Sequence, residues 1–268
     1  MIDIYPLSSA ALTAPRRVTR YVLIWCASGE ITVAIDGNHY HLTPRSLITI
    51  TSGQYHFIRE MKEEEGFVLE FTYDFFCKDD NDIELIFENG LFCHFDENQI
   101  INIPDADLIQ SQLVCIEEEL RQKSYQHQIV IHASIERILV EINRTKIFRG
   151  EEIWKPDALF LRFLELVRTS FDSRYPLSYY AERLNVPEQR LNDQAKLHTG
   201  KTAQMVIHSL IASEAKRLLI YESASIKEIA HKLGFSDPFY FSNFFKKFTD
   251  QSPKSFRELL SGGLKKVR

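Results

Sequence analysis

Side chains that could contact a nucleic acid lie close together between residues 239 and 247. If this stretch is helical, two rings, a hydroxyl, an amide and two lysines share one face: Phe239, Tyr240, Ser242, Asn243, Lys246 and Lys247. An amide can pair with the edge of an adenine, a ring can contact the methyl group of a thymine, and a lysine can neutralise a phosphate. A polar outer face is also common on an ordinary solvated helix. The sequence around this stretch therefore has to distinguish a nucleic-acid-binding face from a solvated one.

Capping signals predict where this helix begins. Ser225 and Glu228 have the spacing of a capping box, which predicts the start of a first helix. Gly234 can take the left-handed conformation that ends it. Asp237 is then an N-cap and Pro238 the first residue of a second helix. One face of that second helix is expected to be core, together with Phe235 in the turn before it; its residues are Phe241, Phe244, Phe245 and Phe248.

The same order of parts occurs twice. It is found in LSYYAERLNVPEQRLNDQAKLHTG and again in SIKEIAHKLGFSDPFYFSNFFKKFTD. Each copy has a short helix containing Ala181 or Ala230, a turn, and a second helix centred on Leu191 or Phe241. Such a pair has the form of a helix-turn-helix, whose second helix can lie in the major groove of DNA. The repetition favours a nucleic-acid-binding face over a merely solvated one.

The charge balance differs between two parts of the chain. Residues 176–268 carry 15 Lys plus Arg against 9 Asp plus Glu, a surplus of +6, whereas the remainder carries 17 against 28, or −11; together they give the net charge of −5. Such asymmetry is a hint that one part of the chain meets a polyanion. A modest positive surplus is also often just a solvated surface. With 268 residues, the chain is also long enough for two domains that each bury a core.

Several features predict a soluble, cytoplasmic protein. No apolar run approaches the roughly 18 to 20 residues that span a bilayer. The start MIDIYPLSSA lacks the basic leader and the apolar segment of a signal peptide. The four cysteines, Cys26, Cys77, Cys93 and Cys115, lack metal-ligand spacing. We therefore expect buried thiols in a reducing compartment, with neither a disulfide nor a metal.

Strand patterns occupy the first part of the chain, and helical patterns follow. Short runs rich in Val, Ile, Thr and aromatic residues lie between residues 21 and 76, and Asp36-Gly37 is a strong signal for a tight hairpin. These patterns predict a small antiparallel barrel or sandwich. Apolar residues then recur at three- and four-residue spacings, which predicts amphipathic helices in 107–123 and 127–146. The polar stretch FRGEEIWKPD is the best linker candidate.

The C-terminal sequence resembles the AraC/XylS family of transcription regulators. The stretch AKRLLIYESASIKEIAHKLGFSDPFYFSNFFKKFTDQSPKSFREL is similar to the second DNA-binding unit of that family. The residues that carry the resemblance are Ile229-Ala230, Gly234-Phe235, Tyr240-Phe241, Phe245-Lys246-Lys247 and Ser252-Pro253. LNVPEQRLNDQAKLHTGKT and the helix that follows it resemble the first unit and the connecting helix. The resemblance covers roughly residues 160 to 260, and it implies two recognition helices in successive major-groove segments of double-stranded DNA.

The resemblance implies which residues contact DNA. They are Gln189, Arg190, Asn192, Asp193 and Lys196 in the first recognition helix, and Phe239, Tyr240, Ser242, Asn243, Lys246 and Lys247 in the second. Pro187 stands where many relatives have a capping Ser or Thr. Asp193 is acidic where a polar or basic residue is usual, and it could accept from a cytosine amino group or weaken non-specific binding. Asp250 replaces a Gly, which is tolerable because Asp enters the left-handed region readily.

The N-terminal half resembles, less specifically, the cupin-like sensor barrel that many of these regulators carry. The resemblance rests on SGEITVAIDGNHYHLTPRSLITITSGQYH. His39-Tyr40-His41 has the HxH spacing of the metal ligands in cupin enzymes, and alternation along a strand puts both histidines on one face. The pair follows the hairpin turn directly, however, and no Glu follows at the required distance. We therefore expect no catalytic residue, metal or cofactor; a metal-dependent cupin enzyme with an accessory helical domain is the alternative.

The expected fold is an α+β protein of two domains. It has a cupin-like antiparallel β-barrel in 1–105, linker and dimerisation helices in 106–150, and an all-α double helix-turn-helix domain in 155–268. A small-molecule effector would sit inside the barrel, where core packing is the commoner role of the candidate lining residues, Trp25, Tyr55, His56 and Phe71. Expected partners are double-stranded DNA, a second copy of the chain through 106–150, and an effector of unknown identity; RNA polymerase is a further candidate. A DNA-binding regulator without an effector is a second alternative.

Overall fold

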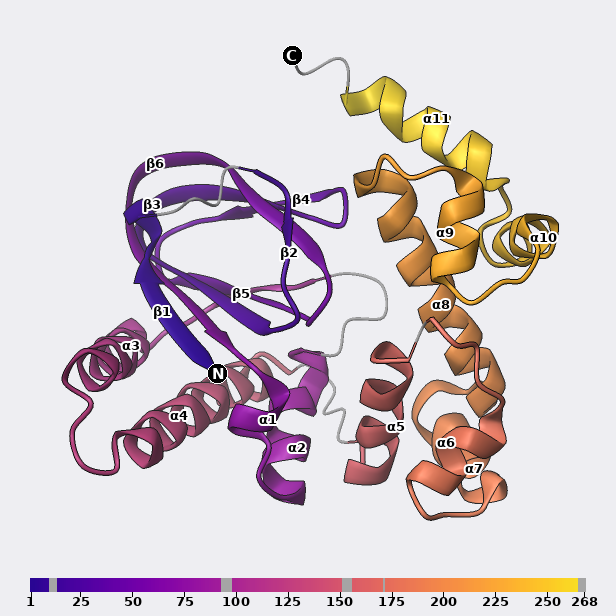
Figure 1. Ribbon diagram of the computed structural model, residues 1–268. Coiled ribbons are helices and arrows are strands. Elements are labelled where there is room, and N and C mark those ends of the chain that lie inside the picture. Colours follow the sequence, from indigo (N-terminus) through magenta and orange to yellow (C-terminus); the bar gives the residue numbers. More distant parts are fainter. Residues whose placement is uncertain (10–13, 93–97, 151–155, 171, 265–268) are drawn as a thin grey trace. The chain divides into compact units, whose positions relative to one another are not determined.

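The first half of the chain is built on an antiparallel sheet. The computed structural model describes residues 1–9, 14–92, 98–150, 156–170 and 172–264. Within the described part, the sheet has seven strands in the order β1-β6-β3-β5-β7, with β2 paired to β6 and β4 to β3 (Figure 1). The strands are β1 (Ile2–Pro6), β2 (Arg16–Arg17), β3 (Tyr21–Ile35), β4 (Asn38–Leu42), β5 (Ser46–Ile50), β6 (Tyr55–Phe71) and β7 (Ile100–Asn102).

The central pair β3 and β6 is longer than the sequence runs suggest. Asp36 and Gly37 have φ angles of 47° and 89° and form the tight turn between β3 and β4, which confirms the hairpin prediction. The short runs YVLIWCAS and EITVAI join, through Gly29, into the single strand β3. It is interrupted by register shifts on both sides of Ser28, where β-bulges bend the strand without ending it.

The two faces of the sheet have different partners. One face carries a cluster of buried side chains from four strands and the short 3-10 helix Leu7–Ser9, which we call the aliphatic face: Leu7, Val22, Ile24, Cys26, Ile31, Val33, Ile35, Leu42, Ile48, Ile50, Ile58 and Val68. The opposite face carries Trp25, whose indole Nε1 donates to Oε1 of Gln110 at 2.9 Å. It also carries Tyr21 and Phe71, whose rings contact Phe87 and Phe76 respectively.

Helices cover that second face. They are α1 (Tyr73–Phe76), α2 (Asp80–Phe87), α3 (Ala106–Gln122) and α4 (His127–Phe148), with a 3-10 turn at Glu88–Gly90. The apolar stripes predicted for α3 and α4 are largely buried, and the fully buried members are Ile109, Leu113, Ile116, Ile131, Ile135, Ile138, Leu139 and Ile142. These helices belong to the same unit as the sheet, Met1–Pro156, and the second unit is Asp157–Arg268.

Two sequence expectations fall partly on residues outside the described ranges. Cys26 is buried, and Cys77 and Cys115 are half-buried, whereas Cys93 lies outside those ranges. Residues 151–155 of the linker candidate also lie outside them.

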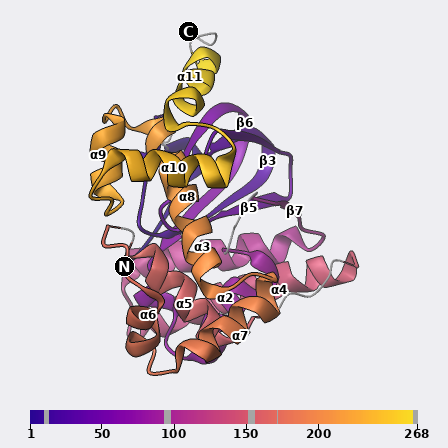
Figure 2. The ribbon, with the colours of Figure 1, turned by 90° about the vertical axis from the view of Figure 1, so that its right-hand side faces the viewer.

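The second unit is helical. Its helices are α5 (Ala158–Arg168), α6 (Leu177–Arg183), α7 (Glu188–Thr199), α8 (Ala203–Tyr221), α9 (Ile226–Lys232), α10 (Pro238–Thr249) and α11 (Pro253–Leu264). The long helix α8 packs against α5 and α7, and also against α9, α10 and α11 (Figure 2). It therefore carries two helix pairs: the first pair is α6 with α7, and the second pair is α9 with α10.

Candidate nucleic-acid interface

The start of α10 is fixed by the caps that the sequence predicts. At α9, the Glu228 N–H donates to Ser225 Oγ at 3.2 Å and the Ser225 N–H donates to Glu228 Oε2 at 2.6 Å, which completes the capping box. Hydrogen bonding from Ser225 to the carboxylate, above all from the backbone N–H, lowers the pKa of Glu228. Gly234 has φ +72°, and the Asp237 carboxylate accepts from the Phe239 N–H at 2.8 Å. The direction in which α10 leaves the turn is thus set by local chemistry.

One face of α10 holds the helix in the unit. Phe241 and Phe245 are fully buried. Phe244 and Phe248 are half-buried, and their ring centroids lie 5.6 and 5.7 Å from that of His208 on α8. Burial, together with the positive charges of Arg174 and Lys247, lowers the pKa of His208, so this histidine packs as a neutral ring. The phenylalanine stripe is therefore core, as the sequence predicts.

The opposite face of α10 is exposed and chemically varied. Phe239 and Tyr240 leave 69% and 67% of their surface in solvent, and Asn243, Lys246 and Lys247 are exposed beside them. Ser242 differs from its neighbours, because it is half-buried and its hydroxyl donates to the Pro238 carbonyl at 2.9 Å. Large rings are usually buried in soluble domains. Two of them exposed at one helix start, next to an amide and lysines, form a surface suited to a flat, anionic partner.

The corresponding face of α7 has fewer available groups. Gln189, Arg190, Asp193 and Lys196 are exposed. The Gln189 side chain donates to Asp193 Oδ1 at 2.8 Å, so these two groups partly satisfy each other. Pro187 stands at the N-cap position of α7, which therefore has no side-chain cap.

Asn192 departs from its expected position on the outer face of α7. It is half-buried, and its Oδ1 accepts from the Ala203 N–H at 3.1 Å. That N–H belongs to the first turn of α8, where backbone donors have no partner within the helix. The asparagine therefore joins α7 to α8. Its spacing gives a hint of this, because it lies three residues before the buried Ala195 and so at the edge of the core stripe.

The four residues expected to line an effector site do not gather in one place. Trp25 and Phe71 lie on the helix-covered face of the sheet. Tyr55 is half-buried, with the Arg17 guanidinium 5.6 Å from its ring centroid. His56 pairs with Ile35 and is 1% exposed, so it lies on the side of the aliphatic face. Successive strand residues point to opposite faces, which separates Tyr55 from His56.

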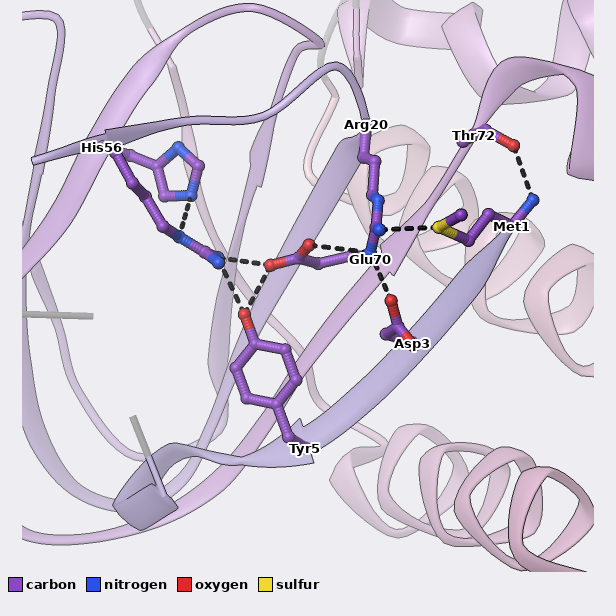
Figure 3. Close-up of polar contacts among 8 residues, drawn as sticks. Met1, Asp3, Tyr5, Arg20, His56, Glu70 and Thr72 are labelled. Atoms are coloured by element: carbon purple, nitrogen blue, oxygen red, sulfur yellow. Dashed lines mark hydrogen bonds and ion pairs between the residues drawn. The ribbon is translucent and has the colours of Figure 1, made fainter. Parts of the chain in front are cut away.

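His56 belongs to a buried polar network that the sequence did not reveal. Arg16 Nε donates to His56 Nε2 at 3.1 Å, and the Arg16 guanidinium also pairs with Glu70 and with the Tyr5 hydroxyl, at 2.7 Å for the latter. Figure 3 shows Glu70 between Tyr5 and Arg20, both of which it contacts. Glu70 is 3% exposed. Its position carries a signal, since Glu70 lies two residues after the buried Val68 and stands within the otherwise apolar run from Phe67 to Phe71.

The network and its burial shift the pKa values of His56 and Tyr5. Burial is the main reason why the pKa of His56 falls to about 4, and the positive charge of Arg16 adds to it. The imidazole is therefore neutral: Nε2 accepts from Arg16, and Nδ1 lies 3.2 Å from the Gln54 carbonyl oxygen, to which it donates. Burial and the Glu70 carboxylate raise the pKa of Tyr5.

The HxH pair does not converge on a common site. His39 and His41 are exposed. His39 Nε2 lies 3.4 Å from Arg59, and His41 Nε2 lies 3.7 Å from Glu30. The two rings thus have separate partners.

Another set of potential ligands, Asp82, His132 and Glu136, lies in α2 and α4. His132 Nε2 is 2.8 Å from the Phe76 carbonyl oxygen and 3.2 Å from Asp82 Oδ2, while Nδ1 is 3.7 Å from Glu136. A carbonyl oxygen only accepts, so Nε2 carries a proton and links α4 to α1 and α2. The two carboxylates face different nitrogens of the His132 ring.

Comparisons with known proteins agree with the helical unit. Residues 180–259 match a family described as a helix-turn-helix domain. The HTH-type transcriptional activator RhaS of Pectobacterium carotovorum is 44% identical over 77 residues, which are 29% of this chain and 28% of the relative. RhaS of Salmonella paratyphi B is 28% identical over 122 residues, which are 46% of this chain and 43% of the relative. The chain thus spans less than half the length of these curated relatives.

A solved structure covers nearly the whole chain. ToxT of Vibrio cholerae with a bound unsaturated fatty acid is 16% identical, covers 98% of this chain and 96% of its own, and has a TM-score of 0.42. Among the helices of the described ranges, none is both long and apolar enough to cross a membrane.

Proposed function

We propose, from the premise that this chain belongs to the AraC/XylS family of transcription regulators, that its C-terminal unit binds double-stranded DNA at specific sequences. The observation that carries the proposal is α10, a helix fixed by its phenylalanine stripe that exposes Phe239, Tyr240 and Asn243. The role is regulatory, and the matched relatives are named as transcription activators, not as enzymes. We assign the site of action to the cytoplasm, where the DNA is.

We assign the two helix pairs to two helix-turn-helix units. In this arrangement α7 and α10 are the recognition helices, and they enter major-groove segments about one helical turn apart, roughly 10 to 10.5 base pairs. The exposed cations Arg190, Lys196, Lys246 and Lys247 would contact phosphates and supply affinity that weakens as salt rises. Gln189, Asp193, Phe239, Tyr240 and Asn243 are the remaining groups able to meet base edges; Ser242 and Asn192 contribute mainly to structure.

The direct test is selection of bound DNA from a randomised library with the full-length protein. The proposal expects one enriched asymmetric site with two half-sites. Failure to enrich any sequence, together with binding that is indifferent to sequence, would contradict it.

Replacing Asn243 by Ala is expected to lower affinity for the selected site by about tenfold, because one bidentate amide-to-base contact contributes roughly 1 to 3 kcal/mol of discrimination. Affinity for unrelated DNA should barely change, since that binding rests on phosphate contacts. Fluorescence anisotropy with the selected and a scrambled duplex measures both values. Gln251→Ala, an exposed amide in the loop after α10, is the matched control. An equal loss on both duplexes would exclude a base-reading role for Asn243.

We assign the N-terminal sheet to the cupin-like barrel of these regulators, supported by its antiparallel, curved strands and the Asp36-Gly37 hairpin. A small molecule bound there would modulate DNA binding. Of the four expected lining residues, His56 lies beside the charged groups of Arg16 and Glu70, but both of its ring nitrogens are already engaged, by Arg16 and by the Gln54 carbonyl oxygen. Trp25 and Phe71 are occupied in packing against the helices.

We also propose a homodimer through α3 and α4. The loop between these helices and the first turn of α4 leave apolar side chains in solvent: Tyr125, Ile129 and Val130 are 90%, 62% and 38% exposed. Ile129→Glu is expected to raise the dissociation constant of the dimer by about tenfold, because it places a charge in an apolar interface. Sedimentation velocity over a concentration series measures this, with the exposed neighbour change Gln128→Glu as the control. Unchanged association would exclude this face.

A further inference from the structure

A loop that precedes the first helix pair reaches the turn of the second pair. The guanidinium carbon of Arg174 lies 4.0 Å from the centroid of the Phe235 ring. Phe235 is buried in the turn between α9 and α10, and its ring contacts Phe241 and Phe244 of α10. Arg174 therefore contacts Phe235, the buried residue against which α10 packs.

A second contact lies next to the first. A Cβ atom at Gly234 would be 2.5 Å from the Asp172 carbonyl oxygen and 3.1 Å from Arg174 Cγ. The backbones of the two segments therefore meet at a distance that only a glycine allows. We call Asp172, Arg174, Gly234 and Phe235 the clasp.

The clasp is a contact between two segments on opposite sides of α8 in the sequence. Helix α8 links the two helix pairs, and the clasp adds a second connection. Residues Asp172 to Arg174 lie shortly before α6, while Gly234 and Phe235 lie shortly before α10. Helix α8 has 19 residues, which corresponds to a length of about 28 Å. At the end of a connection of that length, a small rotation moves a recognition helix by several ångströms. A contact between the loop before α6 and the turn before α10 limits this rotation.

Arg174 is suited to this role. It lies at the surface, so its removal leaves the cores of both pairs intact. Partial burial lowers the pKa of its guanidinium, and partial loss of hydration strengthens the attraction between a cation and a ring face. Its φ of 44° is in the left-handed region, which is unfavourable for a residue with a side chain. The structure keeps an arginine where a glycine would relieve the backbone.

We propose that Arg174 is a positioning residue that fixes the angle between α7 and α10, and thereby sets the spacing between half-sites that the protein accepts. This inference rests on the proposed DNA-binding function. Arg174 acts through the orientation of α10 and contacts no base itself.

The test measures affinity as a function of spacing. The duplex selected by the wild-type protein is compared with duplexes that have one base pair inserted or removed between the half-sites. The wild type should strongly prefer its own spacing. In Arg174→Ala the ratio of affinities between the selected and the altered spacings should fall by about fivefold, the size of one partly exposed cation–ring contact. The base preferences within each half-site should stay the same.

Arg183→Ala is the matched control. The Arg183 guanidinium carbon lies 5.4 Å from the Tyr179 ring centroid, so this contact is of the same kind but lies within α6. It should leave the spacing ratio unchanged. Arg174→Lys keeps the charge but loses the planar group that stacks on the ring, and it should shift the ratio in the same direction by a smaller amount.

The possible outcomes distinguish a failure of the Arg174 proposal from a failure of the proposed DNA binding. If Arg174→Ala weakens binding equally at every spacing, Arg174 has only a structural or phosphate-binding role and the proposal is wrong. If the alanine variant does not fold, the lysine variant gives the same decision through its spacing ratio. If the wild type enriches no DNA at all, the proposed function fails, and the clasp loses its functional meaning with it.

Discussion

Gly234→Ala is expected to destabilise the C-terminal unit by about 3 kcal/mol or more. The left-handed conformation of a residue with a side chain contributes roughly 1 to 2 kcal/mol of this. The remainder comes from overlap, because the new methyl group would lie 2.5 Å from the Asp172 carbonyl oxygen and 3.0 Å from its carbon. Backbone atoms cannot move aside as a flexible side-chain end can. Urea unfolding followed by far-ultraviolet circular dichroism, with hydrogen exchange of α9 and α10, measures the loss.

Gly200→Ala separates the two contributions. Gly200 ends α7 with φ +67°, close to the +72° of Gly234, but an added Cβ would meet no atom within 4 Å. Both alanine variants therefore lose stability because of the left-handed backbone, but only Gly234→Ala also suffers steric overlap. We expect a loss of about 1 kcal/mol at Gly200. Equal losses in the two variants would show that the clasp is not a close contact in solution.

The stability of the N-terminal unit is expected to fall by about 2 to 3 kcal/mol as the pH drops from 7 to 4.5, through His56. The pKa of this histidine is about 4 in the folded protein and about 6.5 in an unfolded chain. Between these values the unfolded state binds a proton that the folded state does not, so lowering the pH favours unfolding. The stabilisation is fully present above pH 6.5 and is lost as the pH falls towards 4.

His56→Gln is the variant that isolates this effect. A glutamine oxygen can still accept from Arg16 Nε, but the side chain does not titrate. The free energy of unfolding of this variant should depend less on pH over the same range. Tryptophan fluorescence follows the N-terminal unit, because both tryptophans of the chain, Trp25 and Trp154, precede Asp157. Parallel pH profiles for the wild type and the variant would assign the acid sensitivity to other groups, among them Glu70.

Features that depend on local chemistry could be predicted from the sequence. The capping box at Ser225 and Glu228, the start of α10 after Asp237 and the tight turn at Asp36-Gly37 each involve residues within a few positions of each other. The left-handed φ of 59° at Asp250 follows from the same kind of argument. The side-chain stripe of α10 follows from its period.

Features that depend on distant partners could not be predicted. Asn192 faces inward because the start of α8 offers it an N–H, and periodicity alone does not reveal a neighbouring helix end. Trp25 and Phe71 look like pocket residues until α1 and α3 cover them. The network of Arg16, His56 and Glu70 joins three strand positions far apart in sequence. In each case the sequence does not reveal which distant elements pack against each other.

The inward turn of Asn192 has a consequence for the proposed DNA site. With Asn192 held by α8 and Gln189 partly held by Asp193, α7 retains few uncommitted groups that could discriminate between bases. Helix α10 keeps an amide and two rings available. In the proposed complex, the half-site under α10 would therefore tolerate fewer base changes than the half-site under α7. Target sites would differ mainly in the half under α7, where base changes would alter binding strength in small steps.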